Sequence, residues 1–275
     1  MQQFCVFGNP ISHSKSPLLH NALFLSQGLQ AFYGRVCLPT TFATTTPTYK
    51  ANPSIYTTFH ALNLTGANIT IPFKEAAFEQ ADEVRGIAKQ IGALNTWVQE
   101  DSKIIGYNTD AQGFFMCIQD LRIESALILG AGGSARAVAC ILHSNGIKTN
   151  IYNRSSTRFS AFKEFTCFGP QEIKSLLTQS YDIVINTTPA GLHSLQADLL
   201  PLDSQILSQI LSKAKFAFDL VYGSPTPFLN LANKLGLQTQ DGTQMLINQA
   251  ALSSELFTFG ECKLENILSV MREVL

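Results

Sequence analysis

The feature that most constrains the fold of this chain is a glycine turn between an apolar strand and a helix. Residues 126–142 read ALILGAGGSARAVACIL. In such a turn the first glycine permits the tight bend, the second lets the backbone approach a pyrophosphate, and a small third residue lets the helix pack against the strand. The helix N-terminus then offers free N–H groups to phosphates. We predict a Rossmann-type dinucleotide site, with ordinary strand-to-helix packing as the alternative. Its predicted contacts are Gly130, Ala131, Gly132, Gly133, Ser134 and Ala135.

The end of the next strand indicates which dinucleotide fits. Chains that bind NAD place an acidic side chain there for the ribose 2′-hydroxyl, whereas this chain reads NIYNRSSTR over residues 150–158. Guanidinium groups pair with a 2′-phosphate in forked geometry, and a carboxylate would repel it. The sequence therefore predicts NADP, and the alternative is that both arginines are solvated surface charges. The predicted contacts are Asn153, Arg154, Ser155 and Arg158.

Short apolar strands alternate with helix-length periodic segments along most of the chain. This pattern is typical of α/β folds, in which helices cover parallel sheets. We expect strands near residues 3–8, 31–36, 66–71, 94–98, 103–106, 125–129, 150–152, 182–185 and 216–220. A chain of 275 residues suits two domains better than one core. Since the last thirty residues have helical periodicity and can fold back, we predict a first domain of residues 1–107 with 243–275, and a Rossmann domain of residues 108–242.

The composition argues against several kinds of partner. The net charge is −1 and 14% of residues are charged, so we expect no nucleic-acid or membrane-surface binding, and a small ligand instead. We also expect no membrane span and no export signal. The six cysteines are scattered without CxxC spacing, which favours free thiols over a metal or disulfide framework and is consistent with a reducing cytoplasm.

The opening loop, GNPISHSKSP at residues 8–17, gathers many hydrogen-bond donors after an apolar strand. Ser16 and Pro17 together predict a helix start, with serine as the N-cap and proline at the first helical position. The loop could bind a ligand, or it could be a turn built from ordinary turn-forming residues.

Seven motifs in order resemble the shikimate/quinate dehydrogenase family along essentially the whole chain. Besides the opening loop and the glycine turn, they are NITIPFK (68–74), GALNT (92–96), GYNTDAQGF (106–114), INTTPAG (185–191) and DGTQMLINQAALSSEL (241–256). The resemblance implies a two-domain NADP-dependent oxidoreductase. Its N-terminal substrate domain would be completed by C-terminal helices, and its reaction would be the reversible reduction of 3-dehydroshikimate to shikimate in aromatic amino-acid biosynthesis.

The resemblance also implies a catalytic pair, Lys74 and Asp110. Oxidation of a secondary alcohol removes a proton from oxygen as hydride leaves carbon, so the site needs a group that takes and returns that proton. Whether Lys74 transfers the proton or chiefly stabilises charge stays open. From the residues alone, Lys74 could be a snorkelling surface lysine and Asp110 the N-cap of a helix that begins at Ala111.

The remaining implied contacts are mostly uncharged, which suits a polyhydroxylated ring, because each unpaired hydroxyl in a closed site would cost roughly 1–3 kcal/mol. Two serines would hold the substrate carboxylate. The implied substrate contacts are Ser14, Ser16, Thr70, Lys74, Asn95, Asp110, Tyr222 and Gln249, and those of the nicotinamide half are Thr188, Leu220 and Gly242. Twelve residues after Lys74, where relatives often carry an acid, this chain has Gly86.

Two alternatives remain at this point: a quinate/shikimate dehydrogenase that uses NAD, and a ligand-binding relative without turnover. The serine pair and Arg154 argue against the first, and the presence of both Lys74 and Asp110 argues against the second. A homodimer is possible.

Overall fold

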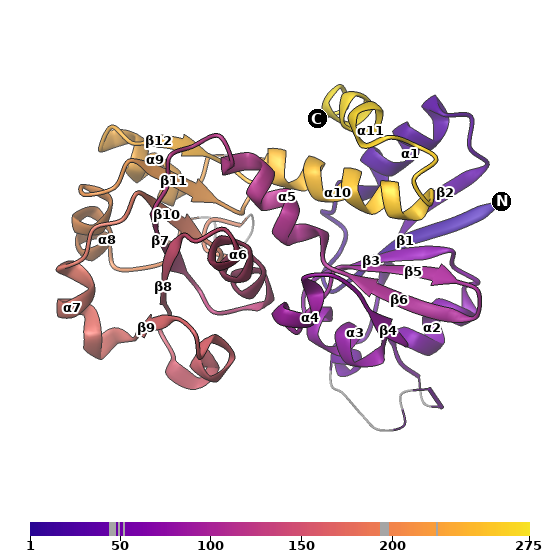
Figure 1. Cartoon of the computed structure of the whole chain (residues 1–275), viewed down its shortest axis with the longest axis horizontal. Coiled ribbons are helices and arrows are strands. Elements are labelled where there is room, and N and C mark those ends of the chain that lie inside the picture. The colour runs from indigo at the N-terminus through magenta and orange to yellow at the C-terminus, as the bar shows by residue number, and fades with distance from the viewer. Residues whose placement is uncertain (44–47, 49, 52, 193–197, 224) are drawn as a thin grey trace. The chain divides into compact units, whose positions relative to one another are not determined.

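In the part of the chain that the structure describes, two six-stranded sheets form the fold, one in each of two compact units (Figure 1). The computed structural model describes residues 1–43, 48, 50–51, 53–192, 198–223 and 225–275. The first unit comprises Met1–Phe114 with Ile247–Leu275, and the second comprises Phe115–Leu246. Both are built from alternating strands and helices, so the predicted α/β class is confirmed.

The sheet of the first unit has the order β2-β1-β3-β5-β6-β4. Its strands are β1 (Gln2–Gly8), β2 (Ala31–Cys37), β3 (Gly66–Ile69), β4 (Glu83–Val84), β5 (Thr96–Glu100) and β6 (Lys103–Tyr107). The sheet is mixed, which the sequence pattern did not predict, because β5 is antiparallel to both β3 and β6. Glu100 and Lys103 pair across a two-residue turn in which Asp101 has a φ of 52°. So short a connection joins only antiparallel strands.

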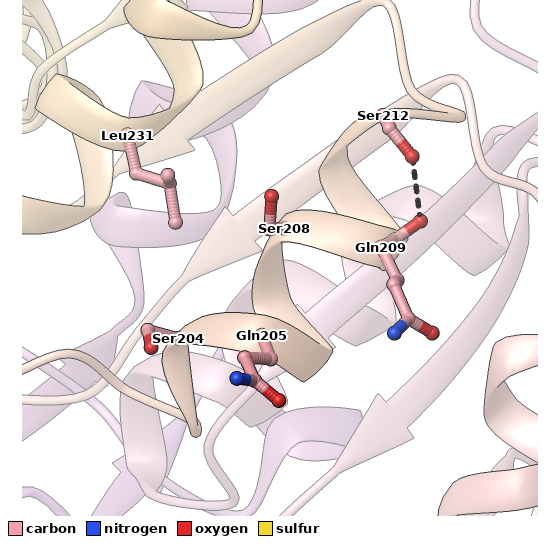
Figure 2. A pocket seen from close by; sticks show the side chains of 6 residues that line it. All are labelled: Ser204, Gln205, Ser208, Gln209, Ser212 and Leu231. Atoms are coloured by element: carbon pink, nitrogen blue, oxygen red, sulfur yellow. Dashed lines mark hydrogen bonds between the residues drawn. The ribbon is translucent and has the colours of Figure 1, made fainter.

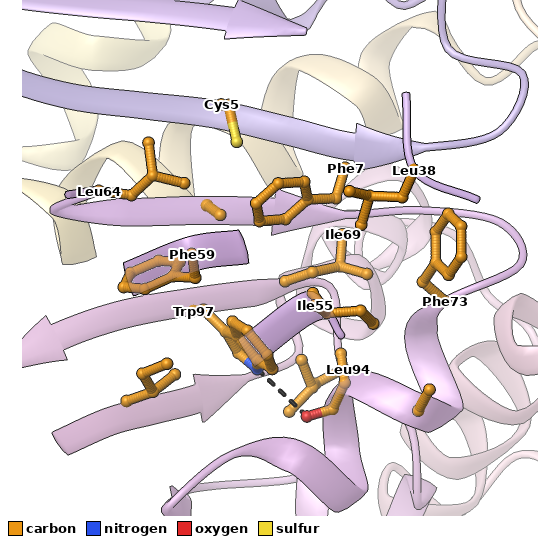
Figure 3. Packing of buried hydrophobic residues seen from close by; sticks show 14 of the residues in the cluster. Cys5, Phe7, Leu38, Ile55, Phe59, Leu64, Ile69, Phe73, Leu94 and Trp97 are labelled. Carbon is orange, nitrogen blue, oxygen red and sulfur yellow. Dashed lines mark hydrogen bonds between the residues drawn. The ribbon is translucent and has the colours of Figure 1, made fainter. Parts of the chain in front are cut away.

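Large apolar side chains fill one face of this sheet (Figure 3). Trp97 is fully buried among them, and its indole N–H donates to the carbonyl of Ala77 at 3.2 Å. The helices of this unit are α1 (Ser16–Ser26), α2 (Ile55–Ala61), α3 (Lys74–Gln80), α4 (Ala88–Ile91), the start of α5 (Thr109–Ile118), most of α10 (Thr243–Phe257), and α11 (Leu264–Arg272), with a 3₁₀ turn at Thr40–Ala43. The core thus holds β3, β5 and α3 in fixed positions, and these elements carry site residues at their ends.

The C-terminal helices complete the first unit, as the sequence predicts. Helix α10 lies beside α5 (Figure 1), where a Cβ on Gly113 would come within 2.8 Å of the backbone nitrogen of Gln249. The amide of Asn248 donates to the carbonyl of Gly113 at 3.1 Å. Only a glycine permits so close an approach of the two helices. Helix α11 buries Ile267, Leu268 and Met271 and contacts α1.

The second unit is a doubly wound parallel sheet with the order β12-β11-β10-β7-β8-β9. Its strands are β7 (Ser125–Leu129), β8 (Lys148–Tyr152), β9 (Thr166–Phe168), β10 (Ile183–Asn186), β11 (Phe216–Asp219) and β12 (Gln238–Gln240). Its helices are α6 (Gly133–Ser144), α7 (Ile173–Leu177), α8 (Ser204–Leu211) and α9 (Pro227–Lys234), with 3₁₀ segments at Ser156–Phe162 and Pro170–Glu172. Read along the chain this is the strand order 3-2-1-4-5-6 of a Rossmann domain, so the prediction for this half is confirmed.

Among the described residues, no helix is long and apolar enough to cross a membrane.

Candidate active site

Lys74 and Asp110 form a partly buried ion pair in the first unit. Lys74 is the first residue of α3, and its Nζ lies 2.5 Å from Oδ2 of Asp110. The two side chains are only 12% and 11% exposed. The alternative of a snorkelling surface lysine is therefore wrong, because the ammonium is directed inward onto a carboxylate.

The alternative role of Asp110, as a helix cap, is wrong as well. Helix α5 begins at Thr109, and the backbone N–H of Ala111 donates to Oδ1 of Asn108 at 3.1 Å. Asn108 thus caps the helix. This leaves both carboxylate oxygens of Asp110 for side chains, Oδ2 for Lys74 and Oδ1 for the amide of Asn95 at 2.9 Å.

Asn95 joins residues from three separate parts of the chain. Its Oδ1 accepts from the backbone N–H of Thr109 at 2.8 Å, which fixes the orientation of the amide. Its Nδ2 then donates to Asp110 and, at 3.3 Å, to Oε1 of Gln249 on α10. The fold-back of the C-terminal helix therefore brings Gln249 against Asn95 across 154 residues of sequence. Lys74, Asn95, Asp110 and Gln249 form one hydrogen-bonded group.

A layer of buried hydroxyl and amide groups lies next to this group and was not predicted from the sequence. Asn68 donates to Oγ of Ser253 at 2.9 Å and to Oγ1 of Thr96 at 3.1 Å, and it accepts from the hydroxyl of Tyr33 at 2.6 Å. One signal in the sequence could have found Ser253, since it follows Gln249 by four residues and so shares its helix face. Tyr33 has no such local signal.

His20 lies behind the same layer and is uncharged at neutral pH. Its ring is fully buried, stacks on Tyr33 at 4.2 Å, and has Nδ1 2.8 Å from Oγ of Ser254. Burial lowers the pKa of His20 to about 3, because the charged form would lose its hydration. His20 therefore contributes packing and one hydrogen bond, and it supplies no positive charge.

Ser14 and Ser16 lie together at the start of α1. The two hydroxyl oxygens are 3.2 Å apart, both residues are buried, and the backbone N–H of Ser16 points at Oγ of Ser14. Arg35 donates twice to the carbonyl of Ser14, at 2.9 and 2.5 Å, and so fixes the loop. The predicted N-cap is wrong. The cap position is Lys15, Ser16 is the first helical residue, and Pro17 is the second.

Two further predicted substrate contacts lie elsewhere. Thr70 directly follows β3, where its backbone N–H donates to the carbonyl of Phe7. Tyr222 is half-buried and belongs to the second unit.

The glycine turn of the second unit has the local geometry that its sequence predicts. Gly130 has a φ of +111°, and a Cβ there would lie 2.6 Å from Oγ1 of Thr187, so only glycine fits. Gly132 precedes α6, and a Cβ at that position would meet no atom of the described protein within 4 Å. Packing does not explain this second glycine, whereas close approach of a phosphate does. Ala135 is fully buried, as helix-to-strand packing requires.

The segment after β8 carries the two arginines predicted to select NADP. The amide of Asn153 donates to the carbonyl of Ser155 at 2.7 Å, and the side chain of Ser155 caps the next 3₁₀ segment. Arg154 and Arg158 are exposed. With no carboxylate in residues 153–158, this strand end fits a 2′-phosphate.

The three residues predicted to contact the nicotinamide half lie just after the carboxyl ends of β10 (Thr188), β11 (Leu220) and β12 (Gly242). Thr188 donates through its N–H and its hydroxyl to Oδ1 of Asn186, at 3.0 and 2.7 Å. Leu220 donates to the carbonyl of Asn186 at 3.0 Å, and Gly242 to that of Val221 at 3.1 Å. Ligands of open α/β sheets bind at this edge.

A surface pocket on the second unit holds none of the predicted residues (Figure 2). It is lined by Ser204, Gln205, Ser208, Gln209, Ser212 and Leu231. The lining carries no titratable side chain, and we assign it no role. Among the described residues, no group of His, Cys, Asp and Glu side chains is arranged to hold a metal ion.

Comparison with known proteins gives consistent matches over the whole chain. The family model for the shikimate dehydrogenase substrate binding domain matches residues 6–97. A shikimate dehydrogenase (NADP(+)) from Helicobacter hepaticus is 50% identical over 280 residues, with 99% of this chain and 98% of that protein covered. The protein of the same name from Helicobacter pylori strain 26695 is 42% identical over 278 residues, with 100% and 99% covered.

Solved structures agree with this result. A shikimate 5-dehydrogenase from Thermus thermophilus, in complex with NADP(H) and shikimate, superposes with a TM-score of 0.81 at 29% identity and covers 100% of both chains. The shikimate dehydrogenase from Aquifex aeolicus gives a TM-score of 0.81 at 29% identity, with 100% of this chain and 97% of that chain covered.

Proposed function

The chain belongs to the shikimate dehydrogenase family, and on that premise we propose that it catalyses the reversible, NADP-dependent reduction of 3-dehydroshikimate to shikimate. The observation that carries the proposal is the partly buried Lys74–Asp110 pair, held against Asn95 and Gln249. The reaction is a step of aromatic amino-acid biosynthesis.

The Lys74–Asp110 pair supplies what the carbonyl oxygen needs. NADPH, when bound, supplies the hydride to C3 of the substrate. The electron pair of the carbonyl then moves to oxygen, and the ammonium of Lys74 donates a proton or a charged hydrogen bond to it. If Lys74 donates the proton, its neutral amine takes the proton back in the oxidation direction. Asp110 holds the ammonium in place through the 2.5 Å contact.

Neutral donors and acceptors hold the rest of the substrate. The hydroxyls of Ser14 and Ser16 bind its carboxylate, and their loop is fixed for that purpose by Arg35. Asn95 and Gln249 bind ring hydroxyls, together with Thr70. The substrate contact of Tyr222 stays a prediction. The extended contact between Asn95 and Gln249, 3.3 Å, leaves both amides able to exchange partners for a ligand.

The second unit provides the cofactor contacts. The turn from Gly130 to Ala135 holds the pyrophosphate at the start of α6, and Asn153, Arg154, Ser155 and Arg158 bind the 2′-phosphate ribose. Thr188, Leu220 and Gly242 contact the nicotinamide half. The positions of Gly132 and of the two exposed arginines support this assignment.

The decisive measurement is the absorbance of the nicotinamide band with 3-dehydroshikimate and either NADPH or NADH. We expect rapid oxidation of NADPH and much slower oxidation of NADH. Binding of substrate and NADPH without oxidation would favour the ligand-binding relative. A faster reaction with NAD and quinate would favour the quinate/shikimate dehydrogenase.

A homodimer and a cytoplasmic location stay predictions, as do domain limits at residues 107 and 243. Light scattering during size-exclusion chromatography measures the first, and fractionation of cells the second.

A further inference from the structure

Asn186 and Asp219 form a fully buried pair at the edge of the second sheet. They are the last residues of the adjacent parallel strands β10 and β11, and they stand opposite each other in register. Neither side chain is exposed, and Nδ2 of Asn186 donates to Oδ1 of Asp219 at 3.0 Å. The reaction described above uses neither residue.

Residues that follow both strands are hydrogen-bonded to the pair. Oδ1 of Asn186 accepts from the N–H and the hydroxyl of Thr188. Oδ1 of Asp219 also accepts from the N–H of Val221 at 3.0 Å, and its Oδ2 accepts from the hydroxyl of Thr226 at 2.6 Å. Thr226 in turn caps α9.

The carboxylate decides which way the amide of Asn186 points. An ionised carboxylate only accepts hydrogen bonds, so it binds Nδ2 and directs the amide oxygen toward Thr188. The hydroxyl hydrogen of Thr188 is then used inward. Its oxygen also accepts from the backbone N–H of Ala190 at 3.3 Å, which leaves one lone pair to accept from a ligand. A threonine oxygen held in this way suits an amide N–H of a ligand, such as that of a carboxamide.

Asp219 is costly to bury, because the groups that the structure shows bound to it, Asn186, Val221 and Thr226, are uncharged donors. Burial raises the pKa of Asp219 to about 6, and the field of Asp241 adds to the shift. An apolar residue of similar size at such a position is often more stabilising than a buried charge. This unfavourable burial of a carboxylate occurs at the strand edge where ligands of this fold bind, which is consistent with a role in the ligand site.

We propose that Asn186 and Asp219 are positioning residues that hold Thr188 and Leu220 for the nicotinamide carboxamide of NADP(H). The proposal rests on the proposed function, since it names the residues that align one half of the same cofactor site. It predicts that the pair affects binding of the nicotinamide half and leaves binding of the 2′-phosphate half unchanged.

The test uses the full chain and two probes measured by direct titration, NADPH by its fluorescence and adenosine 2′,5′-bisphosphate by calorimetry. Asp219→Ala should weaken NADPH binding about tenfold or more, because it removes a hydrogen-bonded charged group. Binding of adenosine 2′,5′-bisphosphate, which lacks nicotinamide, should change less than about twofold. The control Asp203→Ala removes a carboxylate that caps α8 in the same unit, and it should change neither affinity.

Asp219→Asn is the rescue variant. Its amide oxygen can accept from Asn186 and Val221 while its NH₂ donates to Thr226, so NADPH should bind within about threefold of wild type. Equal losses for both probes in Asp219→Ala would show general damage and overturn the proposal, as would unchanged NADPH binding. If Asp219→Ala does not fold, the isosteric Asp219→Asn decides the test by itself. A tenfold loss of NADPH affinity in that variant would overturn the proposal.

These binding measurements do not depend on turnover. If wild-type protein binds NADPH but does not reduce 3-dehydroshikimate, the proposed function fails while the positioning role can still be confirmed.

Discussion

The role of Asp110 in the first unit depends on its neighbour Asn108. Asp110 stands in the first turn of a helix, where a carboxylate ordinarily serves the backbone. Asn108 takes that role, and the carboxylate is left for Lys74 and Asn95. The motif NTD (108–110) therefore supplies both the helix cap, Asn108, and an acid, Asp110. Because Asn108 binds the backbone, the carboxylate of Asp110 is left for side chains.

Replacing Lys74 tests its part in the reaction. Lys74→Ala should lower kcat by about 10²- to 10⁴-fold, because the oxygen of the substrate loses its proton donor, with little change in KM for shikimate. Lys50 forms an exposed ion pair with Asp82, so Lys50→Ala is the matched control and should leave kcat unchanged. A large rise in KM at unchanged kcat would show that Lys74 only binds substrate.

Replacing Arg154 tests the choice of cofactor. Arg154→Ala should raise KM for NADP about 10- to 100-fold, because one charged hydrogen-bonding group on the 2′-phosphate is lost, and it should leave KM for NAD nearly unchanged. Arg272→Ala, which removes an exposed arginine from α11, is the control. Equal effects on both cofactors would contradict the assignment.

The raised pKa of Asp219 makes stability depend on pH. The pKa of Asp219 in the folded protein, about 6, exceeds the usual value of 3.8. Between these two pH values the folded protein keeps a proton on Asp219 that the unfolded chain has released. This residue's contribution to the free energy of unfolding therefore falls as pH rises from about 4 to 6. Asp219→Asn removes that dependence. Urea unfolding should show the variant gaining about 2–3 kcal/mol on wild type between pH 4 and pH 7. If the free energies of unfolding of Asp219→Asn and wild type depend on pH in the same way, the prediction is contradicted.

At the scale of elements, the crossing of α5 and α10 links packing to substrate binding. Gly113→Ala places a methyl group against the backbone of Gln249, so the free energy of unfolding should fall by about 1–3 kcal/mol. KM for shikimate should rise, because Gln249 moves away from Asn95. Gly28→Ala is the control, since its φ of +65° also causes strain but its surroundings are open. It should lower stability without changing KM.

Strands and helices with strong local patterns could be predicted from the sequence, and those set by distant contacts could not. The strand before Gly130 and the helix after it were found because apolar runs, glycines and small residues agree locally. The short strands β4, β9 and β12 were missed because two or three residues carry no periodicity. The antiparallel place of β5 depends on a two-residue turn whose conformation no apolar pattern reveals.

The site residues also fall into those that could be identified from the sequence and those that could not. Lys74 and Asp110 were identified by resemblance, and the local signals alone gave each an ordinary structural role that the ion pair excludes. Tyr33, Arg35 and Ser253 were missed, because each acts through a partner far away in the chain. Burial together with hydrogen bonding identifies Tyr33 and Ser253, whereas the exposed Arg35 is identified by its hydrogen bonds to Ser14 alone. Both are properties of the folded molecule.

At the scale of the molecule, the two units should differ in their dependence on the C-terminus. Ending the chain after Lys263 removes α11 and its three buried apolar side chains, each of which contributes about 1.5–3 kcal/mol. We expect hydrogen exchange to become faster in the first unit and to stay unchanged in residues 125–240. Faster exchange throughout would show that the units do not unfold separately.

The first unit is assembled from both ends of the chain, and this has a consequence for synthesis on the ribosome. Residues 115–246 leave the exit tunnel as a continuous stretch, before Gln249 and the helix that covers α1. The nucleotide-binding half can therefore fold first, while the half that carries Lys74 must wait until residues 247–275 have also emerged. A nascent chain that is stalled or cut just before residue 247 should therefore bind cofactor while it lacks Gln249, which we propose as a substrate contact.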